Sequence, residues 1–306
     1  MKKNIVTLVS TFMLIFLTAA CSGSPSPTPA NVPVTDREGL TINAPDKIEK
    51  IIVMGGANVE IVSALGLGEK IIAIDTYSEW ATGLAGNLTL LDMMNPDAEK
   101  MIALAPDLII LTGMMKLAGQ DPLETVRESG AVITYIPVSN SIAEIKKDIE
   151  FIGSITKTGQ AAESLIKNME AEIAAVESVG KTITDKKTVY FEISPAPYLY
   201  SFGRGVFIDE MIETIGAVNI FADVEDWISV QEELVVAANP DVILTVTDYI
   251  DDPEGEIMSR SGWDSITAVK NGDVYYIDAN AATLPNHNIT TALKQMAKAV
   301  YPDKYE

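Results

Sequence analysis

The stretch EKMIALAPD, residues 99–107, leads directly into the apolar run LIIL, residues 108–111. Its apolar spacing predicts a short helix that opens with a glutamate, and Pro106 prevents that helix from continuing. The apolar run after it is typical of a buried strand. A second stretch, ELVVAANPD at residues 233–241, leads in the same way into the apolar run at 242–244. The chain therefore contains the same helix-and-strand unit twice.

A second pair of similar segments precedes these two stretches, in the same order. Residues 60–66 begin with a glutamate, carry apolar side chains and end in a glycine, and residues 210–216 do the same. A glycine at that place is typical of a helix C-terminus, because glycine adopts the left-handed backbone conformation without strain. Two matches in one order predict two lobes of similar construction, with Glu99 and Glu233 exposed at equivalent positions.

Length and charge limit the possible classes of protein. The chain has 306 residues, of which 47% are hydrophobic, so it can form two domains with cores of their own. Its 43 acidic side chains outnumber 22 basic ones, which gives a formal net charge of -21. Such a surface repels nucleic acid and anionic lipid headgroups. Composition therefore excludes nucleic acid as a partner and leaves membrane attachment to a covalent lipid.

The N-terminus has the features of a bacterial lipoprotein signal. The apolar stretch at residues 5–17 follows two lysines and is shorter than the roughly 20 residues that a spanning helix needs. Residues 17–21 read Leu-Thr-Ala-Ala-Cys, which resembles the lipobox, whose cysteine is acylated and becomes the mature N-terminus. We expect a signal peptide at 1–20, a lipid on Cys21, and a Ser- and Pro-rich tether at 21–36. The mature protein would then be anchored at the extracytoplasmic face of the bacterial cell membrane.

Strands and helices alternate along most of the remaining chain. Apolar runs predict strands at residues 48–54, 70–75, 107–112, 131–136, 188–193, 242–246 and 273–277, and an alternating pattern predicts an edge strand at 39–44. Helical patterns lie between them, and a last one covers residues 291–300. This alternation predicts an α/β fold with mostly parallel sheets.

Residues 141–179 interrupt that alternation, because their apolar residues keep helical spacing throughout. We expect Gly159 to separate two helices and the second helix to act as a rigid spacer. The predicted domains are therefore an N-terminal lobe at 37–157, an inter-lobe helix at 158–182 and a C-terminal lobe at 183–306.

The sequence resembles the class III, or helical-backbone, solute-binding proteins of ABC importers, the family that serves ferric siderophores, haem and cobalamin. The resemblance covers nearly all of 46–306. It is carried by residues 47–54 with 60–68, Glu99 with 105–107, 203–207 with 216 and 219–221, 227–233 with 240–241, and 271–275. It implies two Rossmann-like lobes joined by one long backbone helix, a single ligand between them, and little hinge closure. A binding protein of this kind is expected to be a monomer, to hold no cofactor and to catalyse no reaction.

The resemblance also implies a role for the repeated glutamates. In the family, one carboxylate on each lobe meets basic residues on the two permease subunits, and Glu99 and Glu233 stand at the matching motif positions. Two like charges held far apart on a rigid body would orient docking. The alternative is that each glutamate only stabilises its helix through the helix dipole.

Candidate ligand contacts follow from the rule that ligands meet the loops at the carboxyl ends of the strands. In the first lobe the rule selects Gly56, Asn58, Tyr77, Trp80, Met114, Met115 and Lys116. In the second lobe it selects Pro197, Tyr198, Tyr200, Trp227, Asp248, Tyr249 and Asn280. Arg204 is the arginine best placed to meet an anionic ligand. For each residue singly, core packing is the alternative explanation.

Aromatic rings and thioethers suit a large, flat or apolar chelate. Tyr77, Tyr198 and Trp227 resemble aromatic contacts of the vitamin B12-binding family member, but two further tryptophans of that member have no counterpart here. Few arginines argue against an anionic catecholate chelate. We therefore expect a neutral or cationic iron chelate of the hydroxamate siderophore type, with cobalamin as the alternative.

Three further classes are less favoured. Haem would require an axial histidine or tyrosine, and His287 is the only histidine. A bare-metal site would need three or four His, Asp or Glu ligands, and a chain with a single histidine argues against it. A lipid-anchored enzyme is disfavoured because the sequence has no nucleophile-elbow, zinc-protease or P-loop motif.

Overall fold

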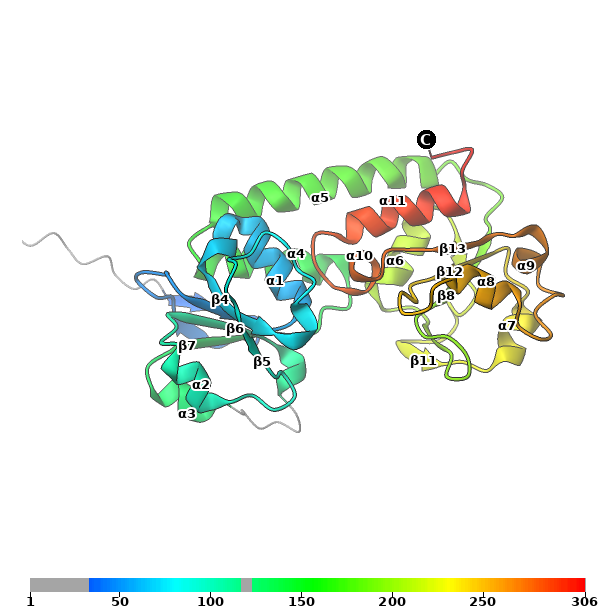
Figure 1. The fold of residues 1–306 in the computed structure, drawn as a ribbon. Helices are drawn as coiled ribbons and strands as arrows, with labels where there is room; N and C mark the ends of the chain where they lie inside the picture. The colour runs from blue at the N-terminus through cyan, green and yellow to red at the C-terminus, as the bar shows by residue number, and fades with distance from the viewer. Residues whose placement is uncertain (1–32, 117–122, 306) are drawn as a thin grey trace, which may run out of the picture. The chain divides into compact units, whose positions relative to one another are not determined.

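The computed structural model describes residues 33–116 and 123–305 (Figure 1). The predicted signal peptide and Cys21 lie outside these residues, as does most of the predicted tether. Within the described residues, no helix is long and apolar enough to cross a membrane.

The first lobe is built on a five-stranded parallel sheet in the order β5-β4-β3-β6-β7. Its strands are β3 (Ile51–Val53), β4 (Ile71–Asp75), β5 (Thr89–Leu91), β6 (Leu108–Thr112) and β7 (Val132–Ile136). Alternate strand residues point to opposite faces, so each face has its own apolar cluster. Helices α1 (Gly56–Val62) and α4 (Ile142–Ile155) cover one face, and α2 (Ala98–Ala103) and α3 (Glu124–Glu128) cover the other.

The second lobe repeats this plan with a four-stranded parallel sheet in the order β10-β8-β12-β13. Its strands are β8 (Thr188–Glu192), β10 (Val218–Asn219), β12 (Val242–Thr245) and β13 (Val274–Tyr276). Helices α6 (Phe207–Thr214) and α11 (Ile289–Val300) cover one face, and α7 (Glu232–Ala238), α8 (Pro253–Met258) and α9 (Thr267–Asn271) cover the other. A separate antiparallel ribbon pairs β9 (Tyr200–Phe202) with β11 (Trp227–Ser229).

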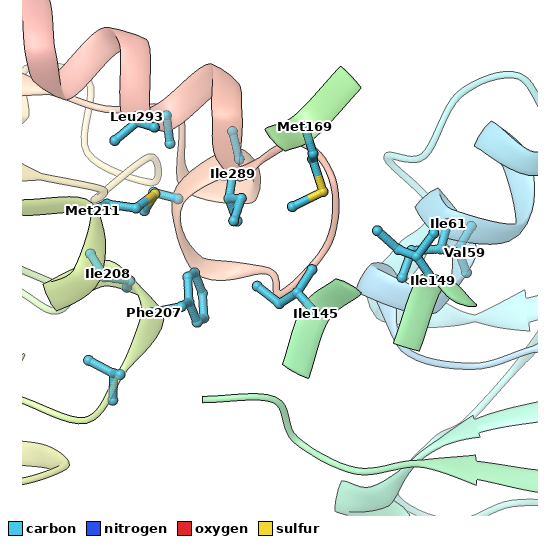
Figure 2. Close-up of a cluster of buried hydrophobic side chains, with 14 of the residues drawn as sticks. Val59, Ile61, Ile145, Ile149, Met169, Phe207, Ile208, Met211, Ile289 and Leu293 are labelled. Carbon is cyan, nitrogen blue, oxygen red and sulfur yellow. The ribbon is translucent and has the colours of Figure 1, made fainter. Parts of the chain in front are cut away.

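The predicted long helix is present as α5 (Gly159–Gly180), which has 22 residues. Ala162, Met169 and Val176 are buried at intervals of seven residues, so one stripe of α5 faces the protein. Figure 2 shows Met169 among side chains from α1 and α4 of the first lobe and from α6 and α11 of the second. The two predicted lobes and the backbone helix are confirmed, and one continuous apolar cluster joins them beneath α5.

Short strands account for most of the difference between the predicted and observed elements. The sequence patterns do not predict β5, β9, β10 or β11, which have only two or three residues each and therefore show no periodicity. The expected edge strand at 39–44 corresponds to β2 (Thr41–Asn43), whose antiparallel partner β1 (Pro33–Thr35) lies within the expected tether. The Ser- and Pro-rich composition of the expected tether is not typical of a strand, so the sequence does not predict this pairing.

The C-terminal end of α5 touches the second lobe so closely that only glycine fits. A Cβ atom on Gly180 would lie 2.2 Å from the backbone oxygen of Thr214. We expect Gly180→Ala to lower the free energy of unfolding by about 1–3 kcal/mol, because backbone must move to relieve the overlap. Gly159→Ala, at the other end of the same helix, is the control: nothing lies within 4 Å of its added Cβ, so it should stabilise slightly. Urea denaturation of both variants tests this, and equal stabilities would contradict it.

Candidate ligand-binding site

A cavity of about 330 Å³ lies at the carboxyl ends of the strands of the first sheet. The loops after β3, β4, β6 and β7 form most of it, as expected for a parallel sheet. The described residues that line it are Gly55, Gly56, Ala57, Asn58, Asp75, Tyr77, Trp80, Met93, Thr112, Met114, Ile136, Pro137, Val138, Asp148, Asn280, Thr283, Leu284 and Pro285. Most of these side chains are apolar, which suits an organic ligand.

The second lobe contributes one wall of the cavity. Helix α10 (Ala279–Thr283) follows β13 and supplies Asn280 and Thr283, and the next two residues are Leu284 and Pro285. A Cβ atom on Gly56 would lie 3.2 Å from Leu284 Cδ1. The cavity is therefore an inter-lobe site, and a glycine at the start of α1 lets the two lobes approach.

Trp80 forms the aromatic side of the cavity. Its ring reaches within 2.8 Å of the position that a Cβ on Gly56 would take. The indole Nε1 donates a hydrogen bond to the backbone oxygen of Tyr77 at 2.8 Å, which fixes the plane of the ring. Trp80 is 39% exposed and Tyr77 is 64% exposed, so both rings have free surface that a ligand can cover.

Two buried carboxylates also line the cavity, and both are already engaged by the protein. Asp75 accepts hydrogen bonds from the backbone N–H groups of Gly55 and Tyr77 and from the Ser78 hydroxyl. Asp148 accepts from Arg37 Nε and from the Ser139 hydroxyl. Burial raises the pKa of Asp148, and its two hydrogen bonds oppose that rise. No lysine or arginine is among the described lining residues, so the cavity offers an anionic ligand no direct cationic partner.

The first-lobe residues selected by the sequence divide into two groups. Gly56, Asn58, Tyr77, Trp80 and Met114 line the cavity. Asn58 uses its Nδ2 to hydrogen-bond the backbone oxygen of Met54 at 3.0 Å. Met115 does not line it, because it is 5% exposed and packs in the apolar cluster on the α2 face of the sheet. Lys116 does not line it either.

Lys116 instead forms an ion pair with Glu38, in the turn between β1 and β2. Its ammonium group also lies 4.3 Å from the centre of the Tyr135 ring. These two partners draw the side chain away from the cavity, toward the N-terminal hairpin.

Of the second-lobe residues selected by the sequence, Asn280 lines this cavity and the others lie outside it. Tyr200 and Trp227 stack on the β9–β11 ribbon with ring centres 6.2 Å apart, and Arg204 pairs with Glu225 at 2.8 Å. Tyr198 and Tyr249 are the two most exposed large hydrophobic side chains in the described part of the chain. Their part in ligand binding stays a prediction.

Several lining residues were not selected from the sequence. Pro137 and Val138 directly follow β7, so the strand-end rule could have found them. Asp148 and Leu284 could not be found that way, since one lies in the middle of α4 and the other after a five-residue helix. Their position depends on how distant elements pack.

Glu99 and Glu233 occupy equivalent places on the two lobes. Each lies in the first turn of its helix, is exposed, and forms no ion pair with a described residue. Helices α2 and α7 both cover the sheet face opposite to the one that packs toward α5 (Figure 1). A partner could therefore contact both carboxylates without approaching α5.

The pair of Arg37 and Asp148 gives a prediction about stability and pH. Arg37→Ala is expected to lower the free energy of unfolding by about 3 kcal/mol near pH 8, because it leaves a buried carboxylate without its cation. Loss of that cation raises the pKa of Asp148 further. A carboxyl group with a raised pKa in the folded state destabilises the fold fully above that pKa, and progressively less as the pH falls toward its unfolded-state pKa. The deficit relative to wild type should therefore shrink as pH falls. Denaturant titrations from pH 8 to pH 5 measure it.

Asp148→Asn is the matched control, since it should restore most of the stability when added to Arg37→Ala. A deficit that stays constant with pH would contradict this account of the pair.

The fold and the cavity define a two-lobed α/β ligand-binding protein. The chain belongs to the Periplasmic binding protein family, whose sequence profile matches residues 51–281. Members of this family are extracytoplasmic, are not enzymes and carry no cofactor, and those of ABC importers deliver a small-molecule ligand to a permease.

Three similar proteins illustrate the range of the family. The chain is 30% identical over 277 residues to the uncharacterized ABC transporter substrate-binding lipoprotein YvrC of Bacillus subtilis, covering 90% of this chain and 87% of that one. It is 27% identical over 263 residues to the vitamin B12-binding protein of Vibrio cholerae, covering 82% and 89%. The crystal structure of a possible iron-binding periplasmic solute-binding protein from Staphylococcus epidermidis superimposes with a TM-score of 0.73 at 28% identity, covering 83% and 99%.

Proposed function

We propose that this protein captures a neutral or cationic iron chelate of the siderophore type in the inter-lobe cavity and delivers it to an ABC permease. One observation carries the choice of ligand: the cavity is mostly apolar, its two charged lining residues are Asp75 and Asp148, and its described lining has no lysine or arginine. An anionic chelate would lose the hydration of its charge there without gaining a cationic partner. A neutral chelate has no such charge to desolvate, and a cationic chelate would lie near two carboxylates.

Cobalamin is the second candidate. It is supported by the similarity to the vitamin B12-binding protein of Vibrio cholerae and by the free aromatic faces of Trp80 and Tyr77, on which a flat corrin ring could lie. The cavity of about 330 Å³ would enclose only part of such a ligand. The exposed second-lobe residues Tyr198 and Tyr249 would have to cover the remainder.

Delivery would depend on two further features. We propose that Glu99 and Glu233 dock the protein, as a monomer, onto the two permease subunits, because both carboxylates are exposed and lack an ionic partner among the described residues. We also propose that an acylated Cys21, outside the described residues, anchors the protein at the extracytoplasmic face of the membrane. The lipoprotein from Bacillus subtilis supports this localisation.

Thermal melting of the full-length protein with a panel of compounds tests the proposed ligand. The panel comprises a ferric hydroxamate, a ferric catecholate, haemin, cobalamin and molybdate. Only a true ligand raises the melting temperature progressively with concentration. We expect the ferric hydroxamate to do so, and a shift with cobalamin alone would favour the second candidate. A shift with the catecholate or molybdate alone would contradict the charge argument.

A further inference from the structure

Two glutamates in the repeated segments make the same kind of contact in both lobes. Glu60 lies in α1 and Glu210 lies in α6, and each precedes by six residues a glycine in the left-handed conformation, Gly66 with φ 82° and Gly216 with φ 85°. Both helices pack in the apolar cluster that joins the lobes. The two carboxylates therefore occupy matching places in the two halves of the fold.

Each carboxylate reaches across to the other lobe. Glu60 Oε2 accepts a hydrogen bond of 2.9 Å from Nδ2 of Asn288, the residue that precedes the first turn of α11. Glu210 Oε2 accepts a hydrogen bond of 3.1 Å from the backbone N–H of Ile142, the first residue of α4. The first lobe thus holds the start of a second-lobe helix, and the second lobe holds the start of a first-lobe helix.

Both contacts lie close in sequence to the cavity wall. Asn288 follows the lining residues Leu284 and Pro285 by only a few positions, and α4 carries the lining carboxylate Asp148. A shift of either helix relative to the other lobe would therefore change the width of the cavity.

We propose that Glu60 and Glu210 are a matched pair of positioning residues that hold the two lobes at the separation the ligand needs. This proposal rests on the proposed ligand-binding function of the cavity. Neither glutamate lines the cavity itself. The apolar side chains of Figure 2 attract the lobes to one another without fixing their direction, since hydrophobic association is non-directional. Two hydrogen bonds on different helices supply that direction, because a hydrogen bond requires a defined distance and angle.

Two reciprocal hydrogen bonds restrict the relative orientation of the lobes more than one hydrogen bond can. With only one of the two hydrogen bonds, the lobes could still tilt about the remaining one, and the continuous cluster beneath α5 would keep them together. Loss of both should therefore change the separation more than the sum of the single losses. A purely local role, in which each glutamate only stabilises a neighbouring helix end, predicts no change in separation.

The distance between spin labels on the two lobes tests the proposal without any ligand. The full-length chain carries Cys21→Ser, so that labels attach only to Thr125→Cys on α3 and Lys270→Cys on α9, both exposed positions. Pulsed electron resonance then compares this chain with versions that also carry Glu60→Ala, Glu210→Ala or both. We expect a broader distance distribution in each single variant, and a mean that moves by more than about 2 Å in the double variant.

Glutamine is the matched control, because Glu60→Gln and Glu210→Gln keep an acceptor oxygen in place and should retain the wild-type distribution. Asn288→Ala removes the first contact from the other side and should match Glu60→Ala even if the latter folds poorly. An unchanged distribution in the double alanine variant would overturn the proposal. A ligand panel without a melting shift would overturn the proposed function instead, and would leave these distances unaffected.

Discussion

Replacing both Glu99 and Glu233 with alanine is expected to abolish ligand uptake by cells while leaving the affinity of the purified protein for its ligand unchanged. Both carboxylates are exposed and lie on helices away from the cavity, so removing them should disturb neither the fold nor the site. Close charge pairs measured across an interface contribute about 1.5–7 kcal/mol each, and the lower value corresponds to roughly tenfold per glutamate. Uptake of labelled ligand and binding to the isolated variant measure the two effects.

Glu163→Ala is the control for that experiment. Glu163 is also an exposed glutamate, but it lies on α5, whereas α2 and α7 cover the sheet faces that point away from α5. It should leave uptake intact. Charge reversal with Glu99→Lys and Glu233→Lys should be at least as damaging as alanine. Loss of binding together with uptake would contradict a docking role.

Trp80→Ala is expected to weaken binding by about 30-fold or more. An aromatic side chain that a ligand covers in a cavity typically contributes 2 kcal/mol or more, which is about 30-fold. Binding should be measured by calorimetry with whichever compound raises the melting temperature, a ferric hydroxamate or cobalamin.

Trp80→Phe separates the aromatic face from the indole N–H. It keeps a ring against the ligand but loses the hydrogen bond to the backbone oxygen of Tyr77, so a smaller loss of affinity is expected. Leu40→Ala, at a 59% exposed residue outside the cavity lining, should bind like wild type. Wild-type affinity in Trp80→Ala would exclude this cavity and direct attention to the stacked Tyr200 and Trp227.

The fold could be predicted from the sequence because its main elements carry strong local signals. Buried strands such as β6 and β12 are short apolar runs, and Pro106 and Pro240 end the helices before them. The strands of two or three residues could not be predicted in this way. Among the described residues, Thr89–Leu91, for example, pairs with β4 alone, and each partner residue lies sixteen positions away in sequence.

The first-lobe half of the site was predictable for a different reason. In a parallel sheet, the carboxyl ends of all strands meet at one edge, so residues just after the strands gather there without further information. The rule does not distinguish between neighbouring residues. Met114 lines the cavity, whereas Met115, the next residue, packs in the core.

The second-lobe half of the site was harder to predict from the sequence, because one helix and the loop after it form that wall rather than several strand ends. Asn280 was selected by the strand-end rule, but Leu284 reaches the cavity only because the chain between α10 and α11 crosses to the first lobe. Its contact partner Gly56 is more than two hundred residues away in sequence. No local pattern reports a contact of that kind.

Anomalous scattering from crystals grown with a ferric hydroxamate or with cobalamin tests the central claim most directly, since it locates the metal of the bound chelate. Data collected at the iron or cobalt absorption edge should show a single strong peak between Trp80 of the first lobe and Leu284 of the second. A metal peak on an outer face of either lobe, or saturated crystals with no ordered metal, would contradict the claim that this protein holds a metal chelate between its lobes.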